Sequence, residues 1–219
     1  MTECKKLDAL RKEITNRLGE YRAKHVLSTE EEAVRIAEVY LPEKIEKVRI
    51  SALLHDITKE YEVKKQLQIL SDFDIIIDNV IMNSPKVFHA MTAALLIPNE
   101  FSEFSDDEVI SAVKNHTCGH KDMSLMDMII YLADYIEPLR RFEDCQKLRE
   151  YFWSGVEKTV TAEERILHLY RTMVMSFDLT VENLLAEKAV IMPETFEARN
   201  AFVLKCMSIS EGKINERAK

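Results

Sequence analysis

The hydrophobic positions of this chain recur mostly with a helical period, and short polar connections separate one helical stretch from the next. Almost no segment alternates apolar and polar residues in the way that a half-buried strand does. One apolar face runs from Val26 to Tyr40 and ends before Pro42. His25 lies near the start of this helix, and we prefer the longer helix to a rival start at Thr29, where a capping box begins. The pattern predicts an all-α protein.

The middle of the chain continues in the same way. Residues 50–57 form an apolar run that predicts a buried helix. Residues 61–80 hold two periodic pieces broken at Ser71, and the isoleucine run at 75–77 could be a short strand. A further helical face continues past His89.

Capping signals mark the helices that follow. Asp106 and the acidic residues after it predict a helix start, and that helix runs to His116. Ser124 predicts the cap of another helix, which carries its apolar face to Asp134 and ends or kinks near Pro138.

Composition favours a single compact domain without indicating a function. The chain has 219 residues, 47% of them hydrophobic, with only four glycines and five prolines. This length suits one domain with a real core, and the scarcity of turn residues favours helices. We expect one domain over residues 1–219, with a core over about residues 20–203 and a polar, frayed tail after Ser208.

Charge and cysteine usage limit the partners and the compartment. Thirty basic against 38 acidic residues give a net charge of -8, which argues against general nucleic-acid binding. A polyanionic substrate would therefore need a local basic pocket. No apolar run has the length of a signal peptide or a membrane span, so we expect neither export nor membrane insertion. The cysteines show no disulfide-framework spacing, which favours free thiols in a reducing cytoplasm; they are Cys4, Cys118, Cys145 and Cys206.

Histidines and aspartates provide the candidate chemistry. His55 and Asp56 close the apolar run 50–57, where an imidazole beside a carboxylate is costly to bury without a partner, and a metal cation would satisfy both. Such ligands suit a borderline ion such as iron, manganese, zinc or nickel, and no cysteine stands at the spacing of a structural zinc site. Each residue alone is more often a satisfied core residue, but several recur at polar breaks in the helical pattern: His25, His89, His116 with Thr117, and Asp134.

The order of these residues resembles a known family. His25, then His55 with Asp56, then Asp134 is the H…HD…D pattern of the HD-domain metal-dependent phosphohydrolases. A closer resemblance, over about residues 22–202, is to the bacterial YqeK branch, whose members are symmetrical diadenosine-tetraphosphate hydrolases. Four segments carry it: LHDITKE at 54–60, HTCG at 116–119, YLADYIEP at 131–138 with Arg140, and TFEARN at 195–200.

The resemblance implies an HD-domain helical bundle with a metal site. The implied cofactor is a divalent or trivalent ion, with iron favoured and manganese, cobalt or nickel as alternatives. Whether one or two ions bind stays open at this point. The implied metal ligands are His25, His55, Asp56 and Asp134.

Basic and polar residues near these ligands are implied contacts to substrate. Lys59 offers a point charge one helical turn after His55, and Arg140 offers a two-point fork to a polyphosphate. His89 and His116 could hold a second metal ion, but we prefer phosphate contact because Glu137 is the one carboxylate left nearby. The implied catalytic residues are Asp56, Lys59 and His116, and the implied substrate contacts are His25, Lys59, His89, His116, Thr117, Asp134, Arg140, Thr195, Arg199 and Asn200, the last three at the nucleoside.

The favoured function is symmetric hydrolysis of diadenosine tetraphosphate into two ADP. The partner is then a dinucleoside polyphosphate or an ADP- or GDP-like nucleotide, and the base preference and a homodimer are left open. One alternative is an HD-type nucleotidase or phosphodiesterase acting on mononucleotides, and another is a non-catalytic module that binds metal and nucleotide. His120 flanks Gly119 and is interpreted as part of an exposed loop.

Overall fold

The structure is a computed structural model that describes residues 3–217, with side chains described over residues 5–211. Helices are the only regular elements in the described chain, which confirms the all-α prediction. Three of them are short 3₁₀ turns, η1 Pro42–Lys44, η2 Pro85–Val87 and η3 Ser102–Phe104. The α-helices are α1 Glu3–Arg17, α2 Glu20–Tyr40, α3 Ile45–Leu54, α4 Val63–Asp72, α5 Asn79–Met82, α6 Phe88–Glu100, α7 Asp107–Asn115, α8 Leu125–Ile136, α9 Glu143–Val156, α10 Ala162–Ala186 and α11 Pro193–Arg217.

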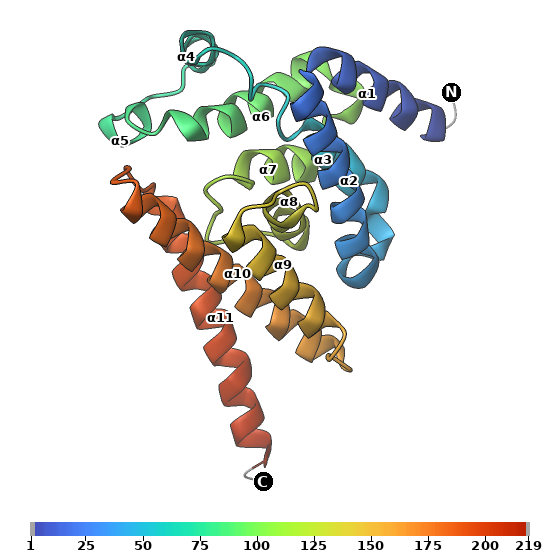
Figure 1. Ribbon diagram of the computed structural model, residues 1–219, viewed down its shortest axis with the longest axis vertical. Helices are drawn as coiled ribbons and strands as arrows, with labels where there is room; N and C mark the ends of the chain where they lie inside the picture. Colours follow the sequence, from blue (N-terminus) through green and yellow to red (C-terminus); the bar gives the residue numbers. More distant parts are fainter. Residues whose placement is uncertain (1–2, 218–219) are drawn as a thin grey trace.

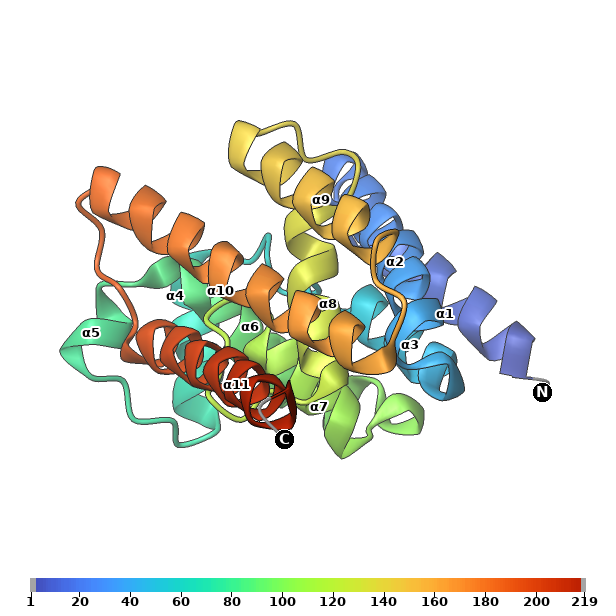
Figure 2. The same cartoon turned by 90° about the horizontal axis from the view of Figure 1, so that it is seen from below.

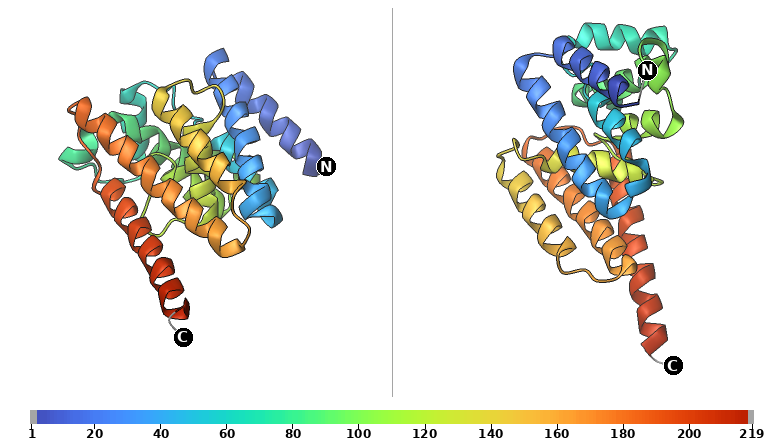
Figure 3. Two further views of the ribbon diagram at one scale, coloured as in Figure 1. Left: turned by 60° about the horizontal axis from the view of Figure 1, so that its bottom comes forward. Right: turned by 90° about the vertical axis from the view of Figure 1, so that its right-hand side faces the viewer.

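Helix α8 lies in the middle of the bundle, with α1 to α3 on one side and α9 to α11 on the other (Figure 1). It packs against α2, α3, α7, α9 and α10. Helices α9 and α10 pack side by side, as do α10 and α11 (Figure 2). The C-terminal part of α11 extends away from the rest of the bundle (Figure 3). Among the described residues, no helix is both long and apolar enough to cross a membrane.

Two apolar cores fix the helices that carry the candidate site. One core includes Ala52 of α3, Leu132 of α8 and Phe177 of α10. The other includes Val26 of α2 and Leu53 of α3. Because α3 contributes to both cores, and α2 does so as well, each of these helices is held from two sides. The residues at their ends are therefore placed rigidly relative to α8.

The helix boundaries confirm several sequence-based expectations. Helix α2 begins at Glu20, ahead of His25, as the longer of the two alternatives requires. Asp106 caps α7, and Ser124 and Asp127 form a reciprocal capping box at the start of α8. These caps satisfy backbone N–H groups at the ends of helices that lead into the site.

Two local expectations are wrong. Helix α3 ends at Leu54, so His55 and Asp56 lie in the tight turns that follow it, where the Lys59 N–H donates to the Asp56 carbonyl. Residues 75–77 form no strand, because no second strand exists in the described chain to pair with them. Helix α11 continues to Arg217, and the frayed tail expected after Ser208 stays a prediction.

Candidate metal centre and phosphate site

The four predicted metal ligands come together at the centre of the bundle. His25 lies on α2, His55 and Asp56 follow α3, and Asp134 lies on α8. His25 Nε2 is 2.9 Å from Asp134 Oδ1 and 3.7 Å from Asp56 Oδ2. His55 Nε2 is 3.6 Å from Asp56 Oδ2 and 3.7 Å from Asp134 Oδ1. Two imidazole nitrogens and two carboxylates thus face one small volume.

The histidine nitrogens that face this volume have no hydrogen-bond partner. The Nε2 atoms of His25 and His55 are buried and make no hydrogen bond, although carboxylate oxygens lie 2.9 Å from the first and 3.6 Å from the second. His55 Nδ1 lies 2.6 Å from the Ala52 carbonyl oxygen, so it donates its proton there. The Nε2 lone pair is then left facing the carboxylates. Unpaired buried nitrogens beside two carboxylates fit a bound cation, and the donor set suits a borderline metal.

Glu137 contacts His25 at Nδ1, on the side of the ring opposite to the aspartates. Its Oε1 atom lies 3.0 Å from His25 Nδ1, and its Oε2 atom accepts a hydrogen bond from the Leu139 N–H at 2.6 Å. Arg149 fixes the same turn by donating to the carbonyl oxygens of Glu137 and Arg140. A carboxylate behind a ligating histidine sets its orientation and raises its basicity. The turn after α8 therefore positions a metal ligand.

Two arginines cover the carboxylates. Arg22 Nη1 donates to Asp56 Oδ2, and Arg140 Nη2 donates to Asp134 Oδ1, both at 2.6 Å. Burial opposes the charged form of each aspartate. The surrounding positive and polar groups outweigh burial, including His55 for Asp56 and Arg140 for Asp134, and hold the pKa of both carboxyls well below the usual range. Both aspartates are therefore anionic and ready to bind a cation.

The same carboxylates act on His25. Burial lowers its pKa, but the nearby carboxylates of Asp134 and Glu137 outweigh burial and raise the pKa to about 9. The volume between the carboxylates thus holds a proton on His25. A metal cation binding there would displace that proton.

A second pair of histidines lies next to the first. His89 Nε2 is 3.0 Å from His116 Nε2 and 3.3 Å from Asp56 Oδ1. Lys59 Nζ is 3.1 Å from His89 Nε2, and Thr117 Oγ1 is also 3.1 Å from that atom. Burial lowers the pKa of His89, His116 and Lys59. Four predicted phosphate contacts, Lys59, His89, His116 and Thr117, therefore form one connected polar cluster beside the predicted metal ligands.

The geometry contains two overlapping sets of candidate ligands. The first joins His25, His55 and Asp134, and the second joins His55, Asp56 and His116. Both share His55, so together they contain all four predicted ligands and add His116. His116 Nδ1 lies 2.6 Å from the Val113 carbonyl oxygen, which leaves its Nε2 lone pair facing Asp56 at 3.7 Å. The second set keeps open whether His116 contacts phosphate or a second ion.

The predicted nucleoside contacts lie at the start of α11. Thr195 is buried, and its hydroxyl donates to the Cys118 carbonyl oxygen at 3.2 Å. Arg199 Nε donates to Asp178 Oδ1 at 2.5 Å, while Asn200 is exposed. Thr195 thus ties α11 to the loop that follows His116. Through the backbone of that loop, the start of α11 is connected to the predicted phosphate contacts His116 and Thr117.

Sequence reasoning missed Arg22 and Arg149 and gave Glu137 no positioning role. Arg22 precedes His25 by three residues and Glu137 follows Asp134 by three, spacings that place side chains near each other on a helix. That spacing could have pointed to both. Arg149 lies one helix later and had no such signal. His120, expected in an exposed loop, is half-buried and accepts a hydrogen bond from the Asp122 N–H at 3.2 Å.

An all-helical bundle that gathers a histidine, a His-Asp pair and a distant aspartate at one buried centre is an HD-type metal-site fold. A model of the HD domain matches residues 22–139, more than half of the chain. The protein belongs to the HD-domain family.

Similar proteins match nearly the whole chain. A symmetrical bis(5'-nucleosyl)-tetraphosphatase of Staphylococcus aureus is 29% identical over 170 residues, covering 76% of this chain and 86% of that protein. A protein of the same name from Halalkalibacterium halodurans is 29% identical over 188 residues, covering 86% of this chain and 92% of that protein. A crystal structure of a predicted HD superfamily hydrolase involved in NAD metabolism, from Clostridium acetobutylicum, superposes with a TM-score of 0.79 at 30% identity, covering 90% of this chain and 97% of that one.

Proposed function

We propose that this protein is a metal-dependent hydrolase that cleaves diadenosine tetraphosphate symmetrically into two ADP. The observation that carries the proposal is the pair of unpaired, buried Nε2 atoms of His25 and His55, which face two anionic aspartates beside a cluster of basic groups. The names of the relatives from Staphylococcus aureus and Halalkalibacterium halodurans support the same substrate class.

The chemistry that a metal ion would supply here is charge neutralisation at a phosphoryl group and activation of water. Its ligands would be His25, His55, Asp56 and Asp134. Overall, one water adds to a central phosphorus atom, one bridging P–O bond breaks, and its electron pair leaves on the second ADP.

Cationic and polar side chains would hold the polyphosphate around the reacting bond. Arg140 would offer its guanidinium to phosphate oxygens, and Lys59 would offer a half-buried ammonium beside His89. Thr117 would donate its hydroxyl to a phosphoryl oxygen. His116 lies on the same side and would donate from Nε2 in its protonated form. Asp56, Lys59 and His116 are thus the proposed catalytic residues, because each faces the place where charge develops. Thr195, Arg199 and Asn200 are proposed to contact the nucleoside.

Finer features belong to the same proposal. Iron is the proposed ion, with manganese, cobalt and nickel as alternatives, because mixed imidazole and carboxylate ligands suit these metals. The side chains of Cys118, Cys145 and Cys206 are free thiols, which accords with a reducing cytoplasm; the side chain of Cys4 lies outside the described residues. A homodimer stays a prediction, and analytical ultracentrifugation would test it.

Hydrolysis in oxygen-18 water tests the reaction. Protein purified without oxygen is assayed for bound metal and then given diadenosine tetraphosphate. We expect ADP as the only product, with label in half of the molecules, because one half of the substrate receives the water oxygen and the other half departs. Equal amounts of ATP and AMP would mean asymmetric attack. Phosphate released from mononucleotides without dinucleotide turnover would favour a nucleotidase, and binding without turnover would favour a non-catalytic module.

A further inference from the structure

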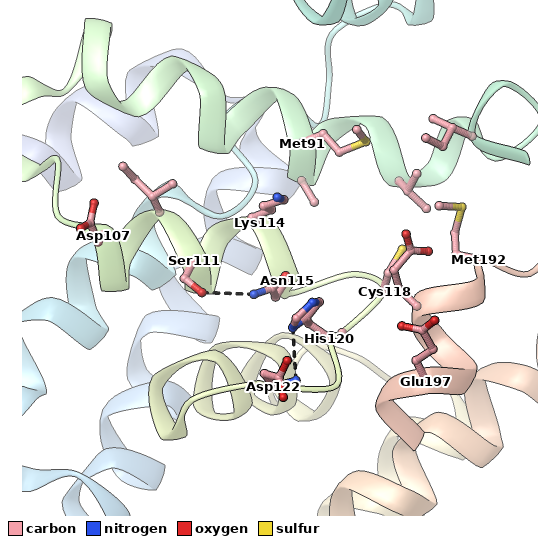
Figure 4. A pocket seen from close by; sticks show the side chains of 16 residues that line it. Met91, Asp107, Ser111, Lys114, Asn115, Cys118, His120, Asp122, Met192 and Glu197 are labelled. Atoms are coloured by element: carbon pink, nitrogen blue, oxygen red, sulfur yellow. Dashed lines mark hydrogen bonds between the residues drawn. The ribbon is translucent and has the colours of Figure 1, made fainter. Parts of the chain in front are cut away.

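A cavity of about 740 Å³ lies between α6, α7, the loop after α7 and the start of α11 (Figure 4). None of the proposed metal ligands lines it. Its size suits a small organic ligand, since ligand pockets usually enclose about 300–1,000 Å³. The cavity is thus a separate space from the metal centre, and the function proposed above gives it no role.

The cavity adjoins the residues proposed to contact phosphate. Ala90 and Met91 line it and directly follow His89, while Cys118 and Gly119 line it and follow Thr117. Consecutive Cα atoms are about 3.8 Å apart, so these walls start within one or two residues of two proposed phosphate contacts. The cavity is therefore close enough to the metal centre for the far half of a long dinucleoside polyphosphate to reach it, although His89, His116 and Thr117 themselves do not line it.

The lining favours an uncharged, flat ligand that donates hydrogen bonds. Met91 and Met192 reach it from different walls (Figure 4), and thioether side chains pack well against aromatic rings. Glu194 Oε2 is buried and has no hydrogen-bond partner, so it is an acceptor that lacks a donor. The lining has four acidic residues and one lysine, Lys114, so it disfavours a phosphate group. The acidic residues are Asp107, Asp122, Glu194 and Glu197.

We propose that this cavity binds the nucleoside of the second half of the dinucleoside tetraphosphate. The inference rests on the function proposed above. A nucleoside is uncharged, has a flat base for the two methionines, and carries amino and hydroxyl donors for the carboxylates. Thr195 and Arg199, proposed to contact the first nucleoside, lie four residues apart on α11, whereas Glu194 and Glu197 lie on another face of that helix. Thr195 and Arg199 thus lie on a different face of α11 from the cavity lining, whereas Asn200, three residues after Glu197, lies nearer to the lining.

Blocking the cavity tests the proposal. Ser111 of α7 lines the cavity, and the one side-chain hydrogen bond that the structure shows for it comes from Asn115 on the same helix. Ser111→Trp should therefore fill the cavity with little loss of protein stability. Glu197→Trp blocks it from the opposite side. Ser102→Trp on exposed η3, outside the lining, is the matched control. Each variant is compared with the wild type by its KM for diadenosine tetraphosphate and by inhibition with adenosine tetraphosphate, which lacks the second nucleoside.

We expect both blocking variants to raise the KM for diadenosine tetraphosphate roughly tenfold, as loss of base packing does, while the inhibition constant of adenosine tetraphosphate stays within about twofold. Ser102→Trp should change neither value. An unchanged KM in both blocking variants, or an equal loss for both ligands, would overturn the assignment of the cavity. A wild-type protein that does not cleave diadenosine tetraphosphate would instead refute the proposed function, which separates the two failures.

Discussion

Two pairs of histidines lie side by side in this protein and differ in what surrounds them. His25 and His55 have fixed Nδ1 atoms and unpaired Nε2 atoms that face two carboxylates. His89 and His116 have their Nε2 atoms 3.0 Å from each other, and His89 also contacts Lys59. The first pair has the arrangement of a metal-ligand set, whereas the second is already part of a polar network.

This difference indicates how one residue type takes two roles. A ligand needs a free lone pair and a fixed orientation, which burial next to carboxylates and a rear hydrogen bond provide. A phosphate contact needs a nearby donor, which Lys59 and Thr117 supply around His89. His116 lies between the two cases, since its Nδ1 is fixed like that of His55 while its Nε2 contacts His89. Substitutions in each pair should therefore affect bound metal and turnover differently.

The largest expected effect comes from His55, which belongs to both candidate ligand sets. His55→Ala should remove bound metal and lower the hydrolysis rate by ~1,000-fold, because charge stabilisation at the reacting phosphoryl group is lost. Metal content per chain and ADP release measure the two effects. His89→Ala is the comparison and should keep the metal. Full metal content in His55→Ala would show that the two pairs do not differ as proposed.

His116→Ala should lower the rate by about 100-fold and leave one ion per chain, because it removes a proposed contact to phosphate. Metal analysis together with turnover separates this outcome from its rival. A fall from two ions to one would make His116 a ligand of a second metal and would move it into the first pair.

Glu137→Gln should weaken metal affinity by roughly 10–100-fold, because the amide accepts the His25 N–H less strongly than a carboxylate. Excess metal should restore turnover, which would not follow if the substitution disturbed folding. Glu143→Gln, an exposed position on α9, is the control. Equal metal affinity in both variants would mean that Glu137 does not set the orientation of His25.

Arg140→Lys should keep the metal and lower turnover by about tenfold, because an ammonium cannot reproduce a two-point contact with phosphate. Arg141→Lys changes the exposed neighbour in the same way and should be silent. Loss of metal in Arg140→Lys would instead show that the contact with Asp134 at 2.6 Å maintains the ligand set.

The smallest effect is expected at the start of α11. Asn200→Ala should raise the KM for diadenosine tetraphosphate by about threefold, the size of one exposed neutral hydrogen bond, without changing metal content. Steady-state kinetics at saturating metal measure it. An unchanged KM would remove Asn200 from the proposed nucleoside contacts.

The sequence alone determined the fold class and the candidate ligands. Helical periodicity and caps such as Ser124 are local signals, because a helix closes its hydrogen bonds within a few residues. The order of His25, His55, Asp56 and Asp134 predicted one centre, since burying such groups separately would be costly. The structure places each of the two histidines 2.9–3.7 Å from both aspartates.

Only the tertiary structure decided what lies behind and beside those ligands. The hydrogen bond from His25 to Glu137, the contact from Arg22 to Asp56 and the turn anchored by Arg149 join residues far apart in the chain. The cavity near His89 likewise forms between α6, α7 and α11, and the hydrophobic pattern of each helix alone does not predict it. Periodicity records which face of a helix is buried, but the packing of several helices decides which side chains meet and where space is left.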